Sequence, residues 1–182
     1  MNLWLRIILV MIGSLFRARL TPPFEASRLN FRVLPNDLDT NLHMNNGRYL
    51  TIMDLGRFDL ILRMGLLKAA RRNKWMPVLS AAKVRFRREL RLFQKYRLET
   101  RIVWWSGSHF VMEHRILTAG KSGEEQIAAI ALMLGGIYQR SARRFVPVSE
   151  LMQVVQVHAD SPVATPEVEA FLAAELALKK MV

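Results

Sequence analysis

The sequence predicts an α+β protein in which one long central helix is wrapped by an antiparallel β-sheet of about five strands. Three observations lead to this prediction. A strand-like run precedes a long helical pattern, four strand-like runs follow it in succession, and turn signals separate the later strands as in a meander. Further helical patterns lie at both ends of the chain. The 182 residues suffice for one domain with a substantial core.

The first strand is expected over residues 28–35. Leu29, Phe31 and Val33 alternate with polar residues there, which is typical of a half-buried strand. Pro35 ends the run, because proline has no amide hydrogen for the ladder.

The central helix is expected from Asn46 to about Arg72, because apolar residues recur at steps of three and four. Two glycines lie inside this pattern, each costing about 1 kcal/mol relative to alanine. The first of them, Gly56, therefore indicates a close approach by another backbone.

Four strand-like runs follow, over residues 75–90, 94–106, 108–120 and 124–140. The second and third are joined by a tight Ser-Gly-Ser turn. The last run is apolar on both faces, as expected of a central strand or of a strand at a subunit seam. Its Gly135–Gly136 pair predicts a bulge.

The two ends of the chain are expected to be helical additions to a domain over residues 28–140. Residues 1–20 form a hydrophobic, amphipathic segment whose unbroken apolar stretch, from Ile7 to Phe16, is much shorter than the roughly 20 apolar residues of a spanning helix. Two interpretations stay open: the helix packs on the domain, or it lies on a membrane surface with its arginines at the headgroups. Residues 141–182 predict a helical extension, with a last helix over residues 166–180 that starts at Thr165.

Positive charge is the main unusual feature of the composition. The chain has 27 Lys and Arg against 15 Asp and Glu, and residues 63–101 hold 13 basic residues and 2 acidic ones. Such a field attracts polyanions, namely nucleic acid, anionic lipid or a phosphate-bearing cofactor, although a solvated basic face explains it equally well. The absence of cysteine excludes disulfides, thiolate zinc sites and cysteine nucleophiles.

The candidate site is the stretch NDLDTNLHMNNGRYL, residues 36–50, between the first strand and the helix. No metal site is expected, because His43 with Asp37 or Asp39 offers too few ligands and no second histidine lies nearby. Serine hydrolysis is disfavoured, since the chain has no G-x-S-x-G elbow.

Carboxylate chemistry at a helix start is the remaining interpretation. The first amides of a helix have no intrahelical acceptor and lie at the positive end of its dipole, so they can stabilise an oxyanion. A nearby carboxylate can attack a carbonyl carbon or activate a water. The residues alone leave open a second interpretation, in which Asn45 is only an N-cap and the aspartates only favour the helix dipole.

The run DLDTNLHMNNGRYL, followed by a long helix and four strands, resembles the hotdog-fold thioesterases of the 4-hydroxybenzoyl-CoA thioesterase type. Their signature approximates D-x-D-x-x-G-H-[VM]-N-N-x-x-Y. The resemblance is greatest to the branch typified by thioesterase superfamily member six, and it covers residues 28–140. It implies a hotdog fold and hydrolysis of acyl-CoA, with the coenzyme A thioester as substrate and no cofactor.

Carried over residue by residue, the resemblance places the catalytic carboxylate at Asp39 and the amide that binds the thioester oxygen at Asn46 or its neighbour. It implies that His43 and Asn45 shape the loop, with His43 a third candidate for the catalytic site, as a hydrogen-bonding brace more than as a base. Asn45 and Tyr49 are the expected substrate-binding residues of the motif, and Tyr49 matches the family's helix tyrosine, which mainly packs.

One position departs from the signature. The glycine before the histidine is Leu42 here, and leucine does not adopt a positive φ cheaply. Other subgroups carry a catalytic acid on the central helix, where this chain offers Asp54 and Asp59.

The basic stretch suits the phosphates of coenzyme A, for which the expected ligands are Arg85, Arg87 and Arg88. The resemblance also implies a homodimer, or a tetramer built from it. The alternative function is a non-catalytic module that binds acyl-CoA or lipid and contacts a membrane through residues 1–20. Nucleic-acid binding is not expected, because it would rest on charge alone. The expected location is the cytoplasm, with or without peripheral contact to a membrane.

Overall fold

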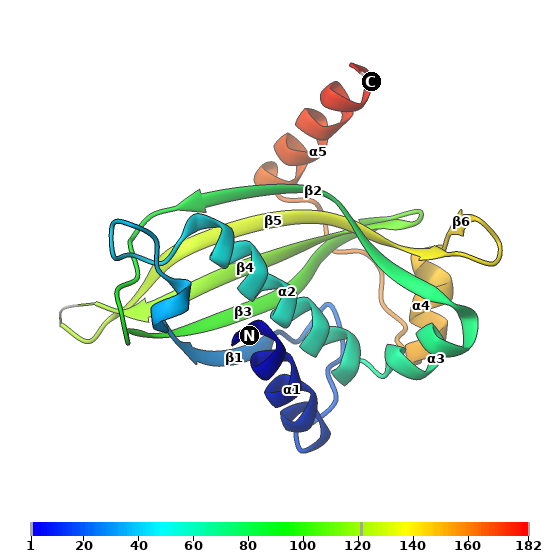
Figure 1. Ribbon diagram of the computed structural model, residues 1–182. Helices are drawn as coiled ribbons and strands as arrows, with labels where there is room; N and C mark the ends of the chain where they lie inside the picture. The colour runs from blue at the N-terminus through cyan, green and yellow to red at the C-terminus, as the bar shows by residue number, and fades with distance from the viewer. Residues whose placement is uncertain (1, 121, 182) are drawn as a thin grey trace.

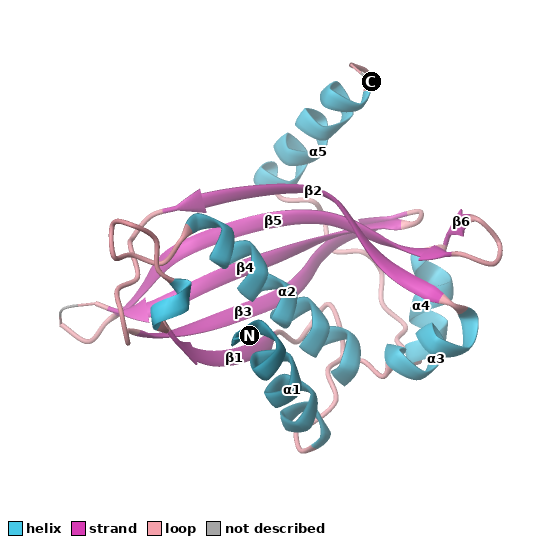
Figure 2. Ribbon diagram, in the orientation of Figure 1, coloured by secondary structure: helices cyan, strands magenta, loops and turns pink. Residues whose placement is uncertain are grey.

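The computed structural model describes residues 2–120 and 122–181, so Met1, Lys121 and Val182 of the predicted segments lie outside the described residues. The architecture is the predicted α+β arrangement. A long helix, α2 (Asn46–Arg63), lies across one face of a curled antiparallel sheet (Figures 1 and 2).

The sheet consists of β1 (Ser27–Arg32), β2 (Trp75–Phe86), β3 (Lys95–Ser106), β4 (His109–Ala119) and β5 (Glu125–Gln139). Their order is β1-β3-β4-β5-β2, every neighbouring pair is antiparallel, and the two-residue β6 (Arg144–Phe145) pairs with β5. The prediction of about five strands is confirmed. The two-faced apolar run, β5, is an interior strand, and β1 and β2 form the edges.

Apolar side chains of β5 are covered on both faces of the sheet, which explains why this strand is apolar on both sides. The main core lies between α2 and the sheet, where Ile52, Met53 and Leu98 are buried. On the opposite face, Val168 and Phe171 from the start of α5 (Pro166–Lys179) pack against Val111 and Leu134. The rest of α5 projects away from the sheet (Figure 1).

The predicted helix from Asn46 to Arg72 is wrong in one respect, because it is two helices. The second, α3 (Leu66–Asn73), starts after Gly65, which has a left-handed φ of 79°. Apolar periodicity continues on both sides of the break, so spacing alone gave no sign of it. Glycine tolerates this conformation without a Cβ clash.

At Gly56 and at the pair Gly135–Gly136, the close approach and the bulge that the sequence predicts involve other groups than expected. A Cβ on Gly56 would overlap the hydroxyl of Thr100 and lie 2.8 Å from Leu98 Cδ2, so side chains of β3 approach it, not another backbone. The bulge expected at Gly135–Gly136 lies opposite, at Ser80 of β2. The glycines instead leave room for neighbouring carbonyls, since a Cβ on either would lie 2.9 Å from one.

The N-terminal helix, α1 (Asn2–Leu15), packs on the domain through a buried ion pair. Arg6 donates to Asp37 Oδ2 at 2.6 Å and to the carbonyl of Arg32 at 3.1 Å, and its guanidinium lies over the Phe31 ring. Arg6 is only 6% exposed. Val10 of the same helix is buried in the main core. The packing interpretation thus holds for one face of α1, with an arginine inside the protein rather than at its rim.

In the C-terminal extension, α4 (Val148–Val155) follows β6. Val148, Leu151 and Met152 are its buried residues. Thr165 is the N-cap of α5 as predicted, although its hydroxyl makes no capping hydrogen bond.

Replacing Arg6 with methionine is expected to lower the free energy of unfolding by about 3–5 kcal/mol, because the Asp37 carboxylate stays buried after its partner is removed. Arg48, 3.5 Å from Asp37, compensates only in part. Arg19→Met removes an exposed arginine just after α1 and should change this free energy by less than about 0.5 kcal/mol. Urea denaturation followed by circular dichroism measures both. Equal losses would contradict a dominant role for the buried pair.

Candidate active site

The motif residues form a tight hairpin that leads directly into α2. Leu38 and Met44 pair across its base, the Asp39 amide donates to the carbonyl of His43 at 2.9 Å, and the Leu42 amide donates to the carbonyl of Asp39 at 3.1 Å. The Met44 amide donates to Leu90 at 2.8 Å, which ties the hairpin to the segment after β2. Backbone hydrogen bonds thus fix the base of the loop and join it to the segment after β2.

Leu42 occupies the left-handed position of this hairpin, with φ 61°. A turn followed by one left-handed residue is a common three-residue hairpin loop, and glycine usually fills that position. This explains why the family signature has glycine there. Leu42 adopts the same backbone at a steric cost of about 1–2 kcal/mol, and its side chain is 71% exposed.

The two aspartates of the motif have different tasks. Asp37 is 1% exposed, accepts the Leu34 amide at 2.9 Å and pairs with Arg6, so it is a structural anchor. Asp39 is half-buried, and its Oδ1 accepts the amides of Asn41 at 2.9 Å and of His43 at 3.4 Å. Its Oδ2 takes no part in these two bonds.

The N-terminus of α2 follows the hairpin immediately. Asn45 is the N-cap, and its side-chain oxygen accepts the Gly47 amide at 2.8 Å. Asn46 is the first helical residue, so its amide belongs to the donors that have no acceptor within the helix. Carboxylate and helix end are thus seven residues apart in sequence and joined by a rigid hairpin.

His43 is braced by a residue that the sequence analysis did not single out. Its Nε2 lies 2.9 Å from Glu89 Oε2, and its backbone bridges to Arg91. The Arg91 guanidinium, which also bonds Glu89, holds the pKa of that carboxyl below its ordinary value, and the nearby His43 acts in the same direction. The pairing joins positions far apart in sequence, so no local pattern marks Glu89.

Tyr49 lies inside the protein and not on an open binding surface. It is 2% exposed, its ring meets Phe86 edge to face at 5.1 Å, and its hydroxyl donates to the carbonyl of Arg88 at 3.4 Å. Burial raises its pKa to about 12. The tyrosine therefore fixes the end of β2 against α2.

The three predicted phosphate ligands lie at or near the end of β2. The amides of Arg87 and Arg88 both donate to the carbonyl of Ala128, and Arg88 contacts Tyr49, so this segment borders the start of α2. Arg85 lies on the edge strand itself. All three are exposed, and within the described part of the chain none of them forms an ion pair.

The acids on α2 differ in exposure. Asp54 is exposed and pairs with Arg57 one turn later. Asp59 is fully buried, accepts the Ser27 hydroxyl at 2.6 Å and lies 3.4 Å from Arg63, so it joins β1 to α2. Among the described residues, no cluster of three or more His, Asp or Glu could hold a metal ion.

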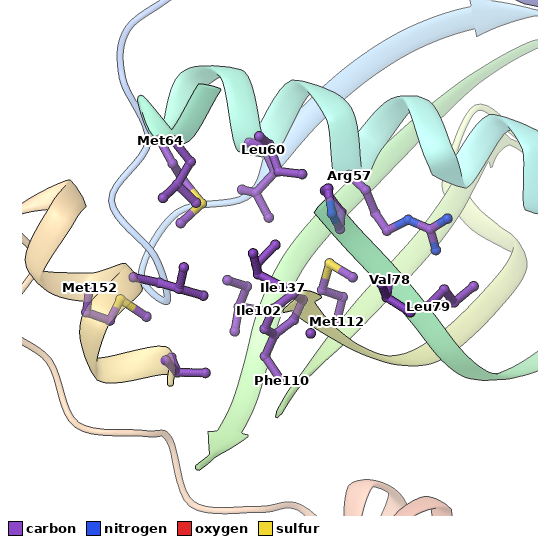
Figure 3. Close-up of a pocket in the computed structure, with 16 residues that line it drawn as sticks. Arg57, Leu60, Met64, Val78, Leu79, Ile102, Phe110, Met112, Ile137 and Met152 are labelled. Carbon is purple, nitrogen blue, oxygen red and sulfur yellow. The ribbon is translucent and has the colours of Figure 1, made fainter. Parts of the chain in front are cut away.

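A cavity of about 180 Å³ lies at the other end of α2 and contains none of the motif residues. Figure 3 shows Leu60 and Met64 reaching from α2 towards Ile102 and Ile137 of the sheet. Residues of α3 and α4 close its far end. Arg57 lies about 16 Å along the helix from Asn46, given 1.5 Å per residue, so the cavity and the motif hairpin are separate.

A curled sheet around one helix, with an aspartate-containing hairpin that leads into the helix N-terminus, defines a hotdog-fold protein with a thioesterase-type loop. The family sequence model of the thioesterase-like superfamily matches residues 33–156, which is more than half of the chain. The protein belongs to this family.

Curated relatives confirm the resemblance to the member-six branch. The chain is 36% identical to Protein THEM6 of Danio rerio over 115 residues, which cover 63% of this chain and 57% of that protein. It is 39% identical to Protein THEM6 of Xenopus laevis over 85 residues, with 47% and 41% covered. The chain therefore spans about half the length of the curated relatives it matches.

Solved structures confirm the fold. The 4-hydroxybenzoyl-CoA thioesterase of Pseudomonas sp. strain CBS-3 superposes with a TM-score of 0.64 at 15% identity, covering 71% of this chain and 98% of that one. A mutant 4-hydroxybenzoyl-CoA thioesterase complexed with 4-hydroxybenzoyl-CoA gives 0.62 at 14% identity, with 67% and 90% covered.

Leu42→Gly is expected to raise the free energy of unfolding by about 0.5–1 kcal/mol, because relief of the left-handed strain exceeds the entropy that glycine adds to the unfolded chain. Thr40→Gly is the matched control. Thr40 lies in the same turn without a positive φ, so its replacement should destabilise by a similar amount. Thermal unfolding of both variants checks this, and a Leu42→Gly loss equal to that of Thr40→Gly would refute the strain.

Proposed function

We propose that the protein hydrolyses acyl-CoA thioesters with Asp39 as the catalytic carboxylate. One observation carries the proposal: a rigid hairpin holds the half-buried Asp39 directly before the N-terminus of α2. Membership of the thioesterase-like family supports it, as does the structural likeness to an enzyme complexed with 4-hydroxybenzoyl-CoA.

In this mechanism the thioester oxygen accepts hydrogen bonds from the first amides of α2, with Asn46 foremost. These donors and the positive end of the helix dipole stabilise the oxyanion. Asp39 acts through Oδ2 in one of two ways. It removes a proton from water, whose oxygen attacks the carbonyl carbon, or it attacks that carbon itself. In the first case the water oxygen becomes one oxygen of the acid product as the C–S bond breaks, and Asp39 passes its proton to the leaving thiolate. In the second case the thiolate leaves as the C–S bond breaks, and the acyl group is held on Asp39 as a mixed anhydride. Water then cleaves this anhydride, which releases the acid and restores the Asp39 carboxylate.

Three exposed arginines supply the binding of the nucleotide end of the substrate. Arg85, Arg87 and Arg88 lie at or near the end of β2 that Tyr49 ties to α2, and they have no carboxylate partners in the described part of the chain. Guanidinium groups form strong paired hydrogen bonds with phosphates. His43 serves as a brace in this scheme, because Glu89 already contacts its Nε2.

A homodimer is part of the proposal. β2 is a twelve-residue strand at the edge of the sheet, and its outer backbone groups offer a second copy a place to add its own β2. Sedimentation equilibrium at micromolar concentration should give twice the mass of the chain, and a monomer would overturn this part of the proposal.

The alternative function is a non-catalytic acyl-CoA- or lipid-binding module at a membrane surface. Two observations favour it: the strained leucine in the glycine position of the hairpin, and an apolar outer face on α1. Six large side chains on that face are between 50% and 79% exposed: Trp4, Leu5, Ile8, Leu9, Ile12 and Leu15. No helix in the described residues is long and apolar enough to cross a membrane.

Asp39→Asn is expected to reduce kcat for acyl-CoA hydrolysis by about 100-fold or more, because the amide neither takes a proton nor attacks the carbonyl. Binding of acyl-CoA should remain within about threefold. Asp160→Asn, at an exposed aspartate of the C-terminal extension, is the control and should leave kcat unchanged. Thiol release from a panel of acyl-CoAs measures the rate, and calorimetry measures binding. If the wild type binds acyl-CoA without turnover, the alternative function stands instead.

Leu5→Glu with Leu9→Glu is expected to weaken association with anionic vesicles by more than tenfold, because the charges would have to enter the apolar region of the interface. Flotation with phosphatidylcholine vesicles that contain phosphatidylglycerol measures this. Leu176→Glu with Leu178→Glu is the matched control, since these α5 leucines are 57% and 60% exposed. Equal losses in the two double variants, or no binding by the wild type, would exclude a membrane contact through α1.

A further inference from the structure

The cavity at the C-terminal half of α2 is almost entirely apolar. Its walls come from α2, α3, α4 and four strands, and among the described residues that line it Arg57 is the only charged one. An apolar cavity of about 150 Å³ holds a benzene molecule, so a volume of about 180 Å³ accepts six or seven carbons. The cavity is separate from the motif hairpin, and the proposed hydrolysis does not use it.

Arg57 stands at the end of this cavity nearer the helix N-terminus. Figure 3 shows its side chain running along α2 away from Met64 and Met152, which lie at the opposite end. One terminal nitrogen pairs with Asp54 on the outside. The other donates to the thioether sulfur of Met133 at 2.8 Å, and a thioether is a weak acceptor.

The guanidinium is therefore poorly compensated on its inner side. The Arg57 side chain is 19% exposed, and burial lowers its pKa because the charged guanidinium is partly desolvated. The pKa of the fully buried His114 is lowered to about 3, mainly by burial and in second place by the positive charge of Arg57. His114 is thus neutral at ordinary pH and adds no second positive charge.

We propose that this cavity binds a monocarboxylate with an apolar tail, such as a medium-chain fatty acid, with the tail among Leu60, Ile102 and Ile137 and the carboxylate at Arg57. Carboxylate oxygens would replace the sulfur as acceptors on the inner side of the guanidinium. The site goes beyond the proposed hydrolysis and does not depend on it, because a free acid binds there whether or not the protein turns over thioesters.

Titration calorimetry of the protein with sodium octanoate tests the site directly. Affinity should rise about fourfold per methylene from butanoate to octanoate, and level off once the tail exceeds the cavity. Octylammonium, which carries the opposite charge on the same tail, should bind at least tenfold more weakly. Affinity that is independent of tail length, equal binding of the two head groups, or no detectable octanoate binding would overturn the proposal.

Arg57→Met should weaken octanoate binding by about tenfold or more, because it removes the charge while keeping a long apolar side chain. The same variant should bind octanol within twofold of wild type. Arg72→Met is the matched control, since it removes one exposed arginine of α3 away from the cavity and should leave octanoate binding unchanged. Equal effects of the two substitutions would mean that net charge, and not this site, binds the acid.

A second variant keeps the test independent of Arg57. Leu79 lines the cavity from the edge strand and is 41% exposed, so Leu79→Trp can narrow the opening without overpacking the core. It should reduce octanoate binding about tenfold at an unchanged melting temperature. Repeating the titrations with octanoyl-CoA on Asp39→Asn separates the free acid from the thioester. If octanoyl-CoA requires Arg57 as strongly as octanoate does, the cavity holds the acyl group of a thioester and the free-acid assignment fails.

Discussion

The buried ion pair between Arg6 and Asp37 is the interaction on which the arrangement of the candidate site depends. Both side chains are buried, so each charge requires the other. Asp37 also accepts the Leu34 amide through its side chain and the Asn45 amide through its carbonyl. One residue thus joins α1, the end of β1, the motif hairpin and the cap of α2. A protein that lost this pair would loosen the hairpin together with the N-terminal helix.

The two aspartates of the motif, two positions apart, have different partners. Asp37 pairs with Arg6, whereas Oδ1 of Asp39 accepts two amides of the turn and its Oδ2 takes no part in those bonds. At the cap of α2, the side-chain oxygen of Asn45 accepts the Gly47 amide, and this bond does not involve the Asn46 amide. The two interpretations that the residues alone left open, a helix cap and an acyl-transfer loop, are therefore compatible in one hairpin.

Local pattern predicted the strands, the order of elements and the extent of the motif, because alternation and turn residues act over a few positions. Features set by packing were not predictable in this way. Gly65 breaks a helix whose periodicity continues beyond it, and the bulge falls on Ser80, across the ladder from the glycines that suggested it. The partner of His43 is Glu89, on a segment beyond α3 and β2. The cavity was not predictable either, because its walls come from α2, α3, α4 and four strands that meet only in the folded protein.

The break at Gly65 fixes where the dipole of α2 ends relative to the cavity. Because α2 stops at Arg63, the negative end of its dipole lies near the end of the cavity that Met64 lines, whereas its positive end lies at the motif hairpin. An anionic amphiphile lying along this helix thus has one favourable orientation. Its negatively charged head points towards the hairpin and its tail towards the break at Gly65. The helix dipole therefore favours this orientation of an anionic amphiphile independently of the side chains that line the cavity.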